Sequence, residues 1–473
     1  MKELPIHIQL NPESDKCLYE QIYEFVRDEI RAGNLLQNEK LPSSRYLAEY
    51  LQVSRTTVDM AYGQLVSEGY LEARPQKGYF VCAIEELYDI KAEAEDAHMQ
   101  KQNVDSKESY QYDFSPNKID MSLFPYATWK KITKNILVDA KSSMFALGEP
   151  QGDLELRTTI CRYLHASRGV NCKPEQIIIG AGNDYLLLLL EKILGRHVPI
   201  AMENPSYKRA YRIFKSFAYP VSLVPMDESG MQIEALKASK AQVAYIMPAH
   251  QYPTGIVMPI GRRMELLKWA AEEENRYLIE DDYDSEFRYR GKPIPSLQAS
   301  DKYGKVVYIG TFSKSIAPAI RISYMVLPEK LLEEYYVNCN FYSSTVSRID
   351  QTILNEFIRD GYFERYLNKM RKHYRMKHDL MLNELKAFES DFAISGEDAG
   401  LHMLLTDKKG RSEQELWNLA AKAGMKVYRM QDAFLETATN ADSKATIILG
   451  YASLSQEQIV EGLRLLQDVW KIT

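Results

Sequence analysis

The sequence predicts an α/β protein with a mixed, mostly parallel sheet and helices on both faces, preceded by a small α+β domain. Three short apolar runs, at residues 177–179, 277–279 and 306–309, are typical of strands buried on both faces. The first eighty residues instead show helical periodicity and a hairpin pattern. Because 473 residues are too many for one hydrophobic core, we expect two or three domains.

A lysine follows the apolar run at 306–309. The run stops at Gly310 and continues into a short polar loop that ends in Lys314. Open α/β sheets bind ligands at the carboxyl ends of their strands, where a partly desolvated lysine can lose its proton and attack a carbonyl. Arg321 lies seven residues further on, within reach of an anion held near the lysine. For this segment alone, a surface lysine on a strand-exit loop is the favoured interpretation.

The run at 277–279 leads into acidic residues, and these favour a functional role for Lys314 over a surface lysine. Four carboxylates fall within five residues there, with Tyr283 among them. Such a cluster is costly at a strand end without a cationic partner, and a pyridinium nitrogen would be one. Pyridoxal phosphate (PLP) needs a lysine for its imine, a carboxylate beside its ring nitrogen, a donor to its 3′ oxygen and an anion cradle. The residues that can fill these roles, in that order, are Lys314, Asp281, Tyr283 and Arg321.

The residues that follow the run at 177–179 can complete the anion cradle. The run continues into Gly-Ala-Gly182 and then into Asn183, Asp184 and a leucine-rich helix. Backbone amides at such a helix start form an anion site. A glycine turn before a helix is a weak signal alone. Together with the lysine, the acidic strand end and the arginine, in this order, it becomes a strong one.

These three stretches resemble fold type I PLP enzymes of the aspartate aminotransferase group, from about Tyr112 to the C-terminus. The resemblance implies that Lys314 forms the Schiff base, that Asp281 pairs with the pyridine nitrogen and that Tyr283 contacts the 3′ oxygen. It implies further cofactor-binding residues: Gly182, Asn183, Asp184, Tyr207, Thr311, Ser313 and Arg321. His250 begins a His-Gln-Tyr-Pro-Thr-Gly segment where such enzymes carry Asn-Pro-Thr-Gly. The missing asparagine bears on the network around the ring oxygen.

The first eighty residues predict three helices followed by a hairpin. Apolar residues recur at helical spacing over 18–31, and proline or serine caps open helices at 41–51 and after Ser54. Two short helices joined by a tight turn form a helix-turn-helix, whose second helix enters the major groove of DNA. The strands on either side of residues 75–78 form the hairpin, which is a wing.

Charge alone leaves a helical protein-interaction module open, because residues 1–82 hold nine Lys and Arg against twelve Asp and Glu. The position of basic residues at helix starts and in the wing favours DNA instead. The segment also resembles the GntR-type winged helix in Leu-Pro-Ser-Ser-Arg45, Val-Ser-Arg-Thr-Thr-Val58 and Gly-Tyr-Phe-Val81. The residues expected to touch DNA are Arg45, Ser54, Arg55, Thr56, Thr57, Lys77 and Gly78.

Residues 83–111 separate the two parts. They carry eight acids, three lysines and few apolar residues, so we expect a linker. A winged helix (1–82), this linker and an aminotransferase-like body (112–473) together resemble the MocR/GabR family of transcription regulators. The resemblance implies an effector-sensing body and a head-to-tail homodimer. Within the body we expect a large subdomain at about 150–345 and a small one at about 346–473 plus 112–149.

The effector can be considered further from two positions. An amino acid that reaches Lys314 needs an arginine for its carboxylate. Arg209 resembles one effector arginine of the GABA-sensing branch, although a helix cap or a surface ion pair is an alternative role. If Val427–Gly450 aligns without a gap, the second arginine of that branch is replaced by Asp432. We therefore hypothesise that the effector is not GABA but carries a cationic or hydroxylated distal end, or that the pocket serves PLP alone.

Other features limit the possibilities. No apolar run is long enough to span a membrane, and the N-terminus does not read as a signal peptide. The five cysteines show no metal-ligand spacing, so we expect no metal site, reduced thiols and a cytoplasmic protein. The formal net charge of −6 does not by itself indicate a nucleic-acid binder.

Two classes of function follow. The first is a DNA-binding transcription regulator that senses an amino-acid-like effector, or PLP itself, through PLP bound as an imine on Lys314. The second is an active PLP-dependent aminotransferase with an attached DNA-binding domain. The sequence shows a complete set of catalytic residue types, so a half-transamination stays chemically open.

Overall fold

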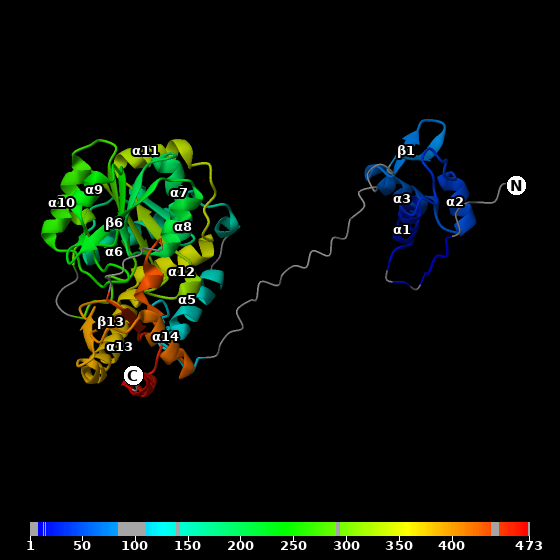
Figure 1. The fold of residues 1–473 in the computed structure, drawn as a ribbon. Coiled ribbons are helices and arrows are strands. Elements are labelled where there is room, and N and C mark those ends of the chain that lie inside the picture. Colours follow the sequence, from blue (N-terminus) through cyan, green and yellow to red (C-terminus); the bar gives the residue numbers. More distant parts are fainter. Residues whose placement is uncertain are drawn as a thin grey trace. The chain divides into compact units, whose positions relative to one another are not determined.

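The computed structural model describes residues 8–12, 14, 16–83, 110–138, 142–289, 294–436 and 444–471. The chain divides into two compact units, residues 1–107 and 108–473 (Figure 1). The predicted linker, apart from its first residue and its last two, lies outside the described residues. None of the helices that the structure describes is both long and apolar enough to cross a bilayer.

The N-terminal unit contains three helices and a two-stranded antiparallel hairpin: α1 (Leu18–Arg31), α2 (Ser44–Leu51), α3 (Arg55–Ser67), β1 (Leu71–Arg74) and β2 (Gly78–Val81). Serine side chains at Ser43 and Ser54 accept hydrogen bonds from the first turns of α2 and α3 and so cap them. Gln52, in the left-handed conformation, ends α2 and begins the tight turn to α3. The predicted winged helix-turn-helix is confirmed.

An eight-stranded sheet forms the centre of the second unit. Its strands, in spatial order, are β4 (Ile177–Gly180), β11 (Ser323–Val326), β10 (Val306–Thr311), β9 (Tyr277–Asp282), β8 (Val243–Ile246), β5 (Ile200–Asn204), β6 (Val221–Asp227) and β7 (Gly230–Met231). The strands from β10 to β6 are parallel, whereas β11, β4 and β7 are joined by antiparallel pairings. The mixed, mostly parallel sheet predicted from the apolar runs is confirmed.

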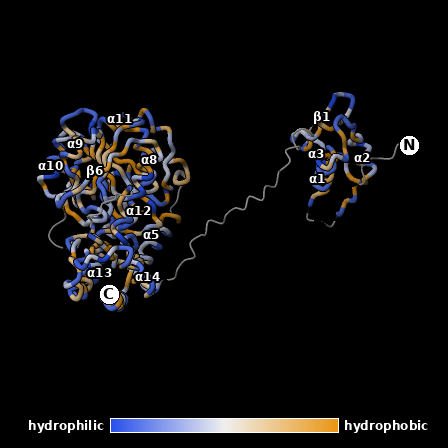
Figure 2. Tube along the Cα trace, in the orientation of Figure 1, coloured by the Kyte–Doolittle hydropathy of each residue, from blue (hydrophilic) through white to orange (hydrophobic). Residues whose placement is uncertain are grey.

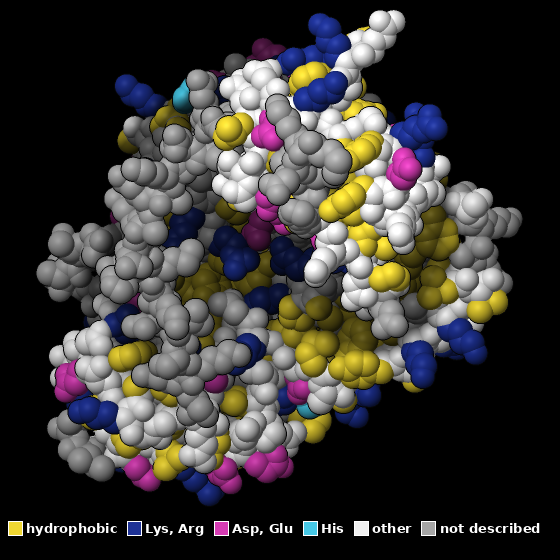
Figure 3. Space-filling view, turned by 90° about the vertical axis from the view of Figure 1, so that its right-hand side faces the viewer, with side chains coloured by type: hydrophobic (Ala, Val, Ile, Leu, Met, Phe, Trp, Pro, Cys, Tyr) yellow, Lys and Arg dark blue, Asp and Glu magenta, His cyan; other side chains and the backbone are white. Residues whose placement is uncertain are grey.

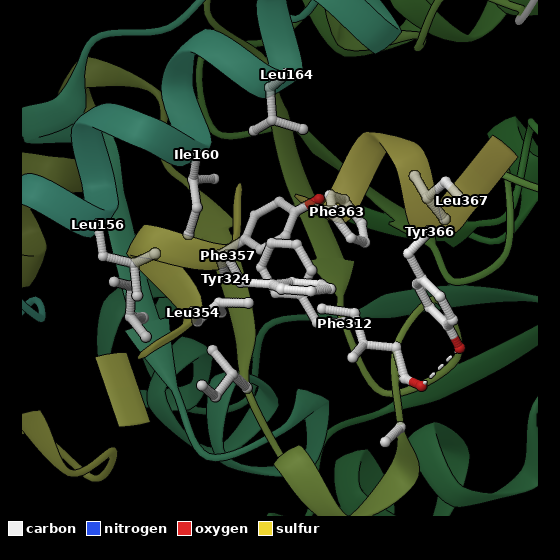
Figure 4. Packing of buried hydrophobic residues seen from close by; sticks show 14 of the residues in the cluster. Leu156, Ile160, Leu164, Phe312, Tyr324, Leu354, Phe357, Phe363, Tyr366 and Leu367 are labelled. Carbon is white, nitrogen blue, oxygen red and sulfur yellow. Dashed lines mark hydrogen bonds between the residues drawn. The ribbon is translucent and has the colours of Figure 1, made fainter. Parts of the chain in front are cut away.

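Helices cover both faces of this sheet: α5 (Tyr126–Val138), α6 (Leu154–Arg168), α7 (Asn183–Leu194), α8 (Lys208–Ser216), α9 (Ile233–Ala238), α10 (Ile260–Ala271), α11 (Glu329–Asn338), α12 (Arg348–Arg359) and α13 (Tyr362–Leu385). Side chains alternate along β10. Val307 and Ile309 pack with α7, α8 and α11, whereas Tyr308 packs with α6, α12 and α13. Figure 4 shows part of the second cluster, in which Leu156, Ile160 and Leu164 of α6 lie near Leu354, Phe357 and Phe363. Hydrophobic residues accordingly concentrate on the central strands and hydrophilic ones on the outer helices (Figure 2).

A smaller sheet lies toward the C-terminus of the chain. Its strands are β12 (Phe392–Ser395), β13 (His402–Asp407), β16 (Thr446–Gly450) and β15 (Tyr428–Arg429), and it packs with α14 (Glu413–Lys422) and α15 (Gln456–Lys471). A separate parallel pair joins β14 (Met425–Lys426) to β3 (Tyr112–Asp113). The segment that starts at β3 therefore begins beside β14, near the smaller sheet. Further along this segment, α5 packs against α12.

Candidate cofactor site and DNA interface

A cavity of about 140 Å³ opens at the carboxyl ends of β9 and β10, next to the start of α7. Its walls combine most of the predicted cofactor-binding residues with three that were not predicted. The lining residues are Asn117, Asn183, Tyr207, Met247, Tyr252, Asp281, Tyr283, Thr311, Ser313, Lys314 and Arg321. Because parallel strands end at one edge of the sheet, segments far apart in the sequence converge here.

Lys314 borders this cavity and is otherwise surrounded by protein. Its Nζ atom lies 5.0 Å from the ring centre of Tyr283 and donates a hydrogen bond to the carbonyl of Pro116 at 3.3 Å. Burial lowers the pKa of the Lys314 amine, and the negative charge of Asp284 opposes this only in part. A larger neutral fraction of the amine at neutral pH suits it to attack a carbonyl carbon.

Asp281 is a second buried titratable residue in the wall of the cavity. Its Oδ1 accepts a hydrogen bond from Asn183 Nδ2 at 3.3 Å, and its Oδ2 accepts one from the hydroxyl of Tyr245. Burial raises the pKa of Asp281 to about 7, and the neighbouring Asp282 and Asp284 charges act in the same direction. Among the residues that the structure describes, this carboxyl has hydrogen-bond donors but no ion pair with a cation, so a protonated ring nitrogen is the group that suits it.

The turn between β4 and α7 lies against Arg321. Gly182 has a φ of +94°, a conformation that favours glycine, and a Cβ atom there would overlap the Arg321 guanidinium and displace it. Arg321 Nη2 also lies 3.4 Å from Asp184 Oδ2. The buried Ser313 Oγ and Asn183 Oδ1 have no hydrogen-bond partner among the described residues. Glycine turn, helix start, arginine and free hydroxyl together suit a phosphate.

A buried histidine, His250, lies two residues before Tyr252, which takes the place of the asparagine in front of Pro-Thr-Gly. His250 Nδ1 lies 2.9 Å from the Tyr283 hydroxyl and 3.0 Å from both carboxylate oxygens of Asp284. Burial acts to raise the pKa of Asp284, but the charge and hydrogen bond of His250 outweigh it, and the net shift is downward. The Tyr283 hydroxyl is therefore held by a histidine–aspartate pair.

The two predicted effector residues lie outside the cavity lining. Arg209, at the start of α8, has 59% of its side chain exposed and lies 3.3 Å from Asp184 Oδ2. Asp432, in the short 3₁₀ helix Met430–Ala433, accepts two hydrogen bonds from Arg429 at 2.9 and 3.0 Å. The structure thus brings Arg209 close to the cradle through Asp184, and it joins Asp432 to an arginine of its own subdomain.

Sequence reasoning missed several residues of the site. Tyr245 reads as an ordinary residue of a buried strand, and Asn117 lies nearly two hundred residues before Lys314. Met247 lies before the His250 segment and Tyr252 within it, and neither carries a signal of its own. Only the arrangement of the strands places Asn117, Met247 and Tyr252 at one cavity and Tyr245 beside Asp281.

The predicted DNA-binding residues lie at the start of α2, at the start of α3 and in the hairpin turn. Arg45, Arg55, Thr56 and Lys77 are exposed, and Thr57 is half-buried. Ser54 Oγ caps α3 by accepting from the Thr57 amide at 3.1 Å. Arg55 has 69% of its side chain exposed and only Asp59, at 3.4 Å, as an ionic neighbour. Gly78 opens β2 with a φ of +108°, a conformation that favours glycine.

Comparison with known proteins agrees with both halves of this description. Residues 18–81 match the model of bacterial regulatory proteins of the gntR family, and residues 111–464 match that of aminotransferase class I and II. An uncharacterized HTH-type transcriptional regulator of Bacillus subtilis, YdeL, is 38% identical over 98% of this chain and 99% of its own length. The probable rhizopine catabolism regulatory protein MocR of Rhizobium meliloti is 29% identical over 98% of this chain and 95% of its own. The chain belongs to the MocR/GabR-type transcription regulators.

Two further proteins, a regulator and an aminotransferase of known structure, are similar to this MocR/GabR-type regulator. The pyridoxine biosynthesis transcriptional regulator PdxR of Corynebacterium glutamicum is 30% identical over 86% of this chain and 87% of its own. The crystal structure of Pyrococcus horikoshii kynurenine aminotransferase superposes with a TM-score of 0.67 at 24% identity, covering 77% of this chain and 91% of that one. That likeness shows the fold. The chain is thus a DNA-binding transcription regulator whose body has the fold of the PLP-dependent class I and II aminotransferases.

Proposed function

We propose that this regulator binds PLP on Lys314 and changes its DNA binding in response to an amino-acid-like effector or to PLP itself. The observation that carries the proposal is the cavity, in which a lysine with a lowered pKa faces a carboxyl with a raised pKa beside a glycine–arginine cradle. Structural ion pairs alone rarely place all of these groups around one cavity.

Each group has a definite role in this proposal. Asp281 would hold the protonated ring nitrogen, and Tyr283 would donate to the 3′ oxygen. Arg321, Ser313 and the amides after Gly182 would hold the phosphate. When bound, PLP supplies an electron sink and a carbonyl carbon that reacts with amines. Lys314, with its depressed pKa, supplies the competing amine that an incoming amino group has to displace.

Two kinds of ligand are candidates for the effector, an amino acid and PLP itself. Arg209 would hold the carboxylate of an amino acid, since it is exposed and adjoins Asp184 beside the cradle. Asp432 in place of a second arginine supports the hypothesis that the effector is not GABA. The likeness to PdxR, a pyridoxine biosynthesis transcriptional regulator, makes a compound related to pyridoxine, such as PLP itself, the alternative effector. Isothermal titration of GABA into the PLP-bound protein tests this hypothesis. Binding of GABA with a micromolar dissociation constant would contradict the hypothesis that the effector is not GABA.

The proposed assembly is a head-to-tail homodimer that binds double-stranded DNA. Large apolar side chains that are exposed on the body support association: Leu147, Val337, Phe341 and Tyr342. Exposed hydrophobic side chains form patches beside Lys and Arg side chains on the face shown in Figure 3. Patches of this kind are typical of association surfaces.

A working aminotransferase is the second candidate, because the lysine and the carboxylate stand in one cavity as catalysis requires. Steady-state assays with an amino donor and 2-oxoglutarate distinguish the two functions. Turnover at about 1 s⁻¹ or faster would lie in the ordinary enzyme range and would overturn a purely regulatory role. Turnover orders of magnitude slower, with effector-dependent DNA binding, supports the sensor.

The first test is an absorbance spectrum of the purified protein and of Lys314→Ala. We expect a visible cofactor band in the wild type that the variant lacks, and a shift of this band with one amino acid of a panel. If the wild type shows no band after added PLP, the proposal fails, and the body is an aminotransferase-shaped scaffold.

A further inference from the structure

Two cysteines and a histidine meet at the C-terminal end of α6, away from the cofactor cavity. Cys161 and His165 lie four residues apart on the helix and therefore share a face. Cys172 lies in the loop between α6 and the 3₁₀ helix Pro174–Gln176. The two Sγ atoms are 3.8 Å apart, Cys161 Sγ lies 3.9 Å from His165 Nε2, and all three ligand atoms lie within 4.8 Å of one another. No other group of three or more such residues lies this close in the part of the chain that the structure describes.

These separations match tetrahedral metal coordination. With metal–sulfur bonds of about 2.3 Å and metal–nitrogen bonds of about 2.0 Å, tetrahedral angles place two sulfurs about 3.8 Å apart and a sulfur and a nitrogen about 3.5 Å apart. The observed sulfur–sulfur distance of 3.8 Å matches the first value, and a small rotation of the exposed His165 ring would bring its Nε2 from 3.9 Å to the second. A disulfide would require the sulfurs to approach to about 2.05 Å. The donors thus stand at the spacing of metal ligands.

The donor atoms lie at the edge of the protein interior. Cys161 and Cys172 are buried, and each sulfur has the other as a neighbour. His165 is exposed, so an ion can reach the site from solvent. Its Nε2 lies 3.0 Å from the Cys172 carbonyl oxygen and 3.3 Å from the Cys172 amide nitrogen, and a metal–nitrogen bond would replace the hydrogen bond that Nε2 makes there.

We propose that Cys161, His165 and Cys172 bind one thiolate-preferring divalent cation of the Zn²⁺ class. Binding replaces the two thiol protons, which leave to solvent, by two metal–sulfur bonds, and His165 Nε2 supplies the third. The Cys172 carbonyl oxygen, 3.2 Å from Cys161 Sγ and 3.0 Å from His165 Nε2, or a water completes the tetrahedron.

A cation here would join the end of α6 to the segment that leads into β4 and the phosphate turn. The inner face of α6 packs into the core through Leu156, Ile160 and Leu164 (Figure 4). At its last residue, Arg168 Nε pairs with Asp282 Oδ2 at 2.8 Å, next to Asp281. The metal would therefore hold a helix end that also contacts the strand carrying the proposed ring-nitrogen partner.

The test is a Co²⁺ titration of the reduced, untagged, full-length protein, followed by absorbance. We expect one equivalent per chain and a thiolate-to-cobalt charge-transfer band that Zn²⁺ abolishes by displacement. Cys161→Ser and Cys172→Ser should lose the band, and His165→Ala should weaken Co²⁺ binding at least tenfold. Cys339→Ser is the matched control, because it removes a buried cysteine of another core cluster and should leave the titration unchanged.

Several outcomes would overturn the proposal. They are a titration without a charge-transfer band, which indicates an adventitious ion only, or a band that survives both Cys161→Ser and Cys172→Ser. A third is a Cys161–Cys172 disulfide found by mass spectrometry in protein whose reduced form binds no Co²⁺. Because His165 is exposed, His165→Ala should fold normally. Zn²⁺ should therefore raise the unfolding temperature of the Cys339→Ser control and not that of this variant.

Discussion

Gly182 shows how one residue shapes the candidate cradle. Replacement by alanine would place a methyl group 2.2 Å from Arg321 Nη2. We expect Gly182→Ala to displace Arg321 and to weaken PLP binding at least tenfold, measured by spectral titration.

The control for Gly182→Ala is Gly195→Ala. Gly195 also has a positive φ, of +90°, but a Cβ there meets nothing within 4 Å. That variant therefore carries the backbone strain, on the order of 1 kcal/mol, without the clash. Equal PLP affinity in both alanine variants would contradict the proposed role of the Gly182–Arg321 contact.

The raised pKa of Asp281 predicts how the free energy of unfolding depends on pH. Its folded-state pKa of about 7 exceeds the unfolded value of about 4, so between these limits the native state of the cofactor-free protein holds a proton that the unfolded state has lost. Its stabilising contribution is complete below about pH 4 and is lost as the pH rises through about 7. We expect the free energy of unfolding to fall over this window, by on the order of 4 kcal/mol at most from this group.

Denaturant unfolding of the cofactor-free protein at several pH values measures this effect. Asp281→Asn keeps an acceptor for Tyr245 and should show a smaller decline than the wild type. Identical slopes in the two proteins would show that Asp281 is already ionised in the native state. The remaining slope in the variant belongs to other buried acids, since burial also raises the pKa of Glu280 and Glu286 to about 7.

At the scale of the element, α3 carries one residue expected to affect stability and another expected to affect DNA binding. Ser54 caps the helix, so Ser54→Ala should destabilise the winged-helix unit by about 1 kcal/mol. Arg55 is mostly exposed, so Arg55→Ala should leave thermal unfolding unchanged and weaken DNA binding, with a smaller dependence of affinity on salt.

DNA binding by fluorescence anisotropy at several salt concentrations, together with thermal unfolding, tests this pair of variants. Glu68→Ala, at the C-terminal end of α3, is a charge-removing control that should not weaken DNA binding. Undiminished affinity in Arg55→Ala would remove this arginine from the proposed interface.

At the scale of the whole molecule, the exposed apolar side chains of the body predict a dimer interface. Val337 and Phe341 are 76% and 74% exposed, and the Phe341 ring lies 4.4 Å from that of Tyr342. We expect Phe341→Glu to raise the dimer dissociation constant at least tenfold, measured by sedimentation equilibrium, because a charge would be buried in an apolar contact. Tyr303→Glu, at an equally exposed aromatic residue (70%), is the control. A stable Phe341→Glu dimer would place the interface elsewhere.

The periodic elements were predictable because their signals are local. The helix predicted at 18–31 is α1, and the caps and turn residues predicted the rest of the winged helix. The three apolar runs predicted β4, β9 and β10, since strands buried on both faces need continuous apolar sequence. Lys314 and Asp281 could be singled out because they come at or just after the ends of such runs, and Arg321 because it lies seven residues beyond Lys314.

The sequence by itself determined the fold class, the two-part organisation and the residue types of the candidate cofactor site, because these depend on local periodicity and short motifs. Only the tertiary structure brought Tyr245 to Asp281, Asn117 to the cavity of Lys314, and Cys172 to within 3.8 Å of Cys161. It also paired His250 with Asp284, 34 residues further along the chain. These contacts arise where strand ends and helix ends converge. Such convergence depends on sheet order and helix packing, which no local pattern along the chain encodes.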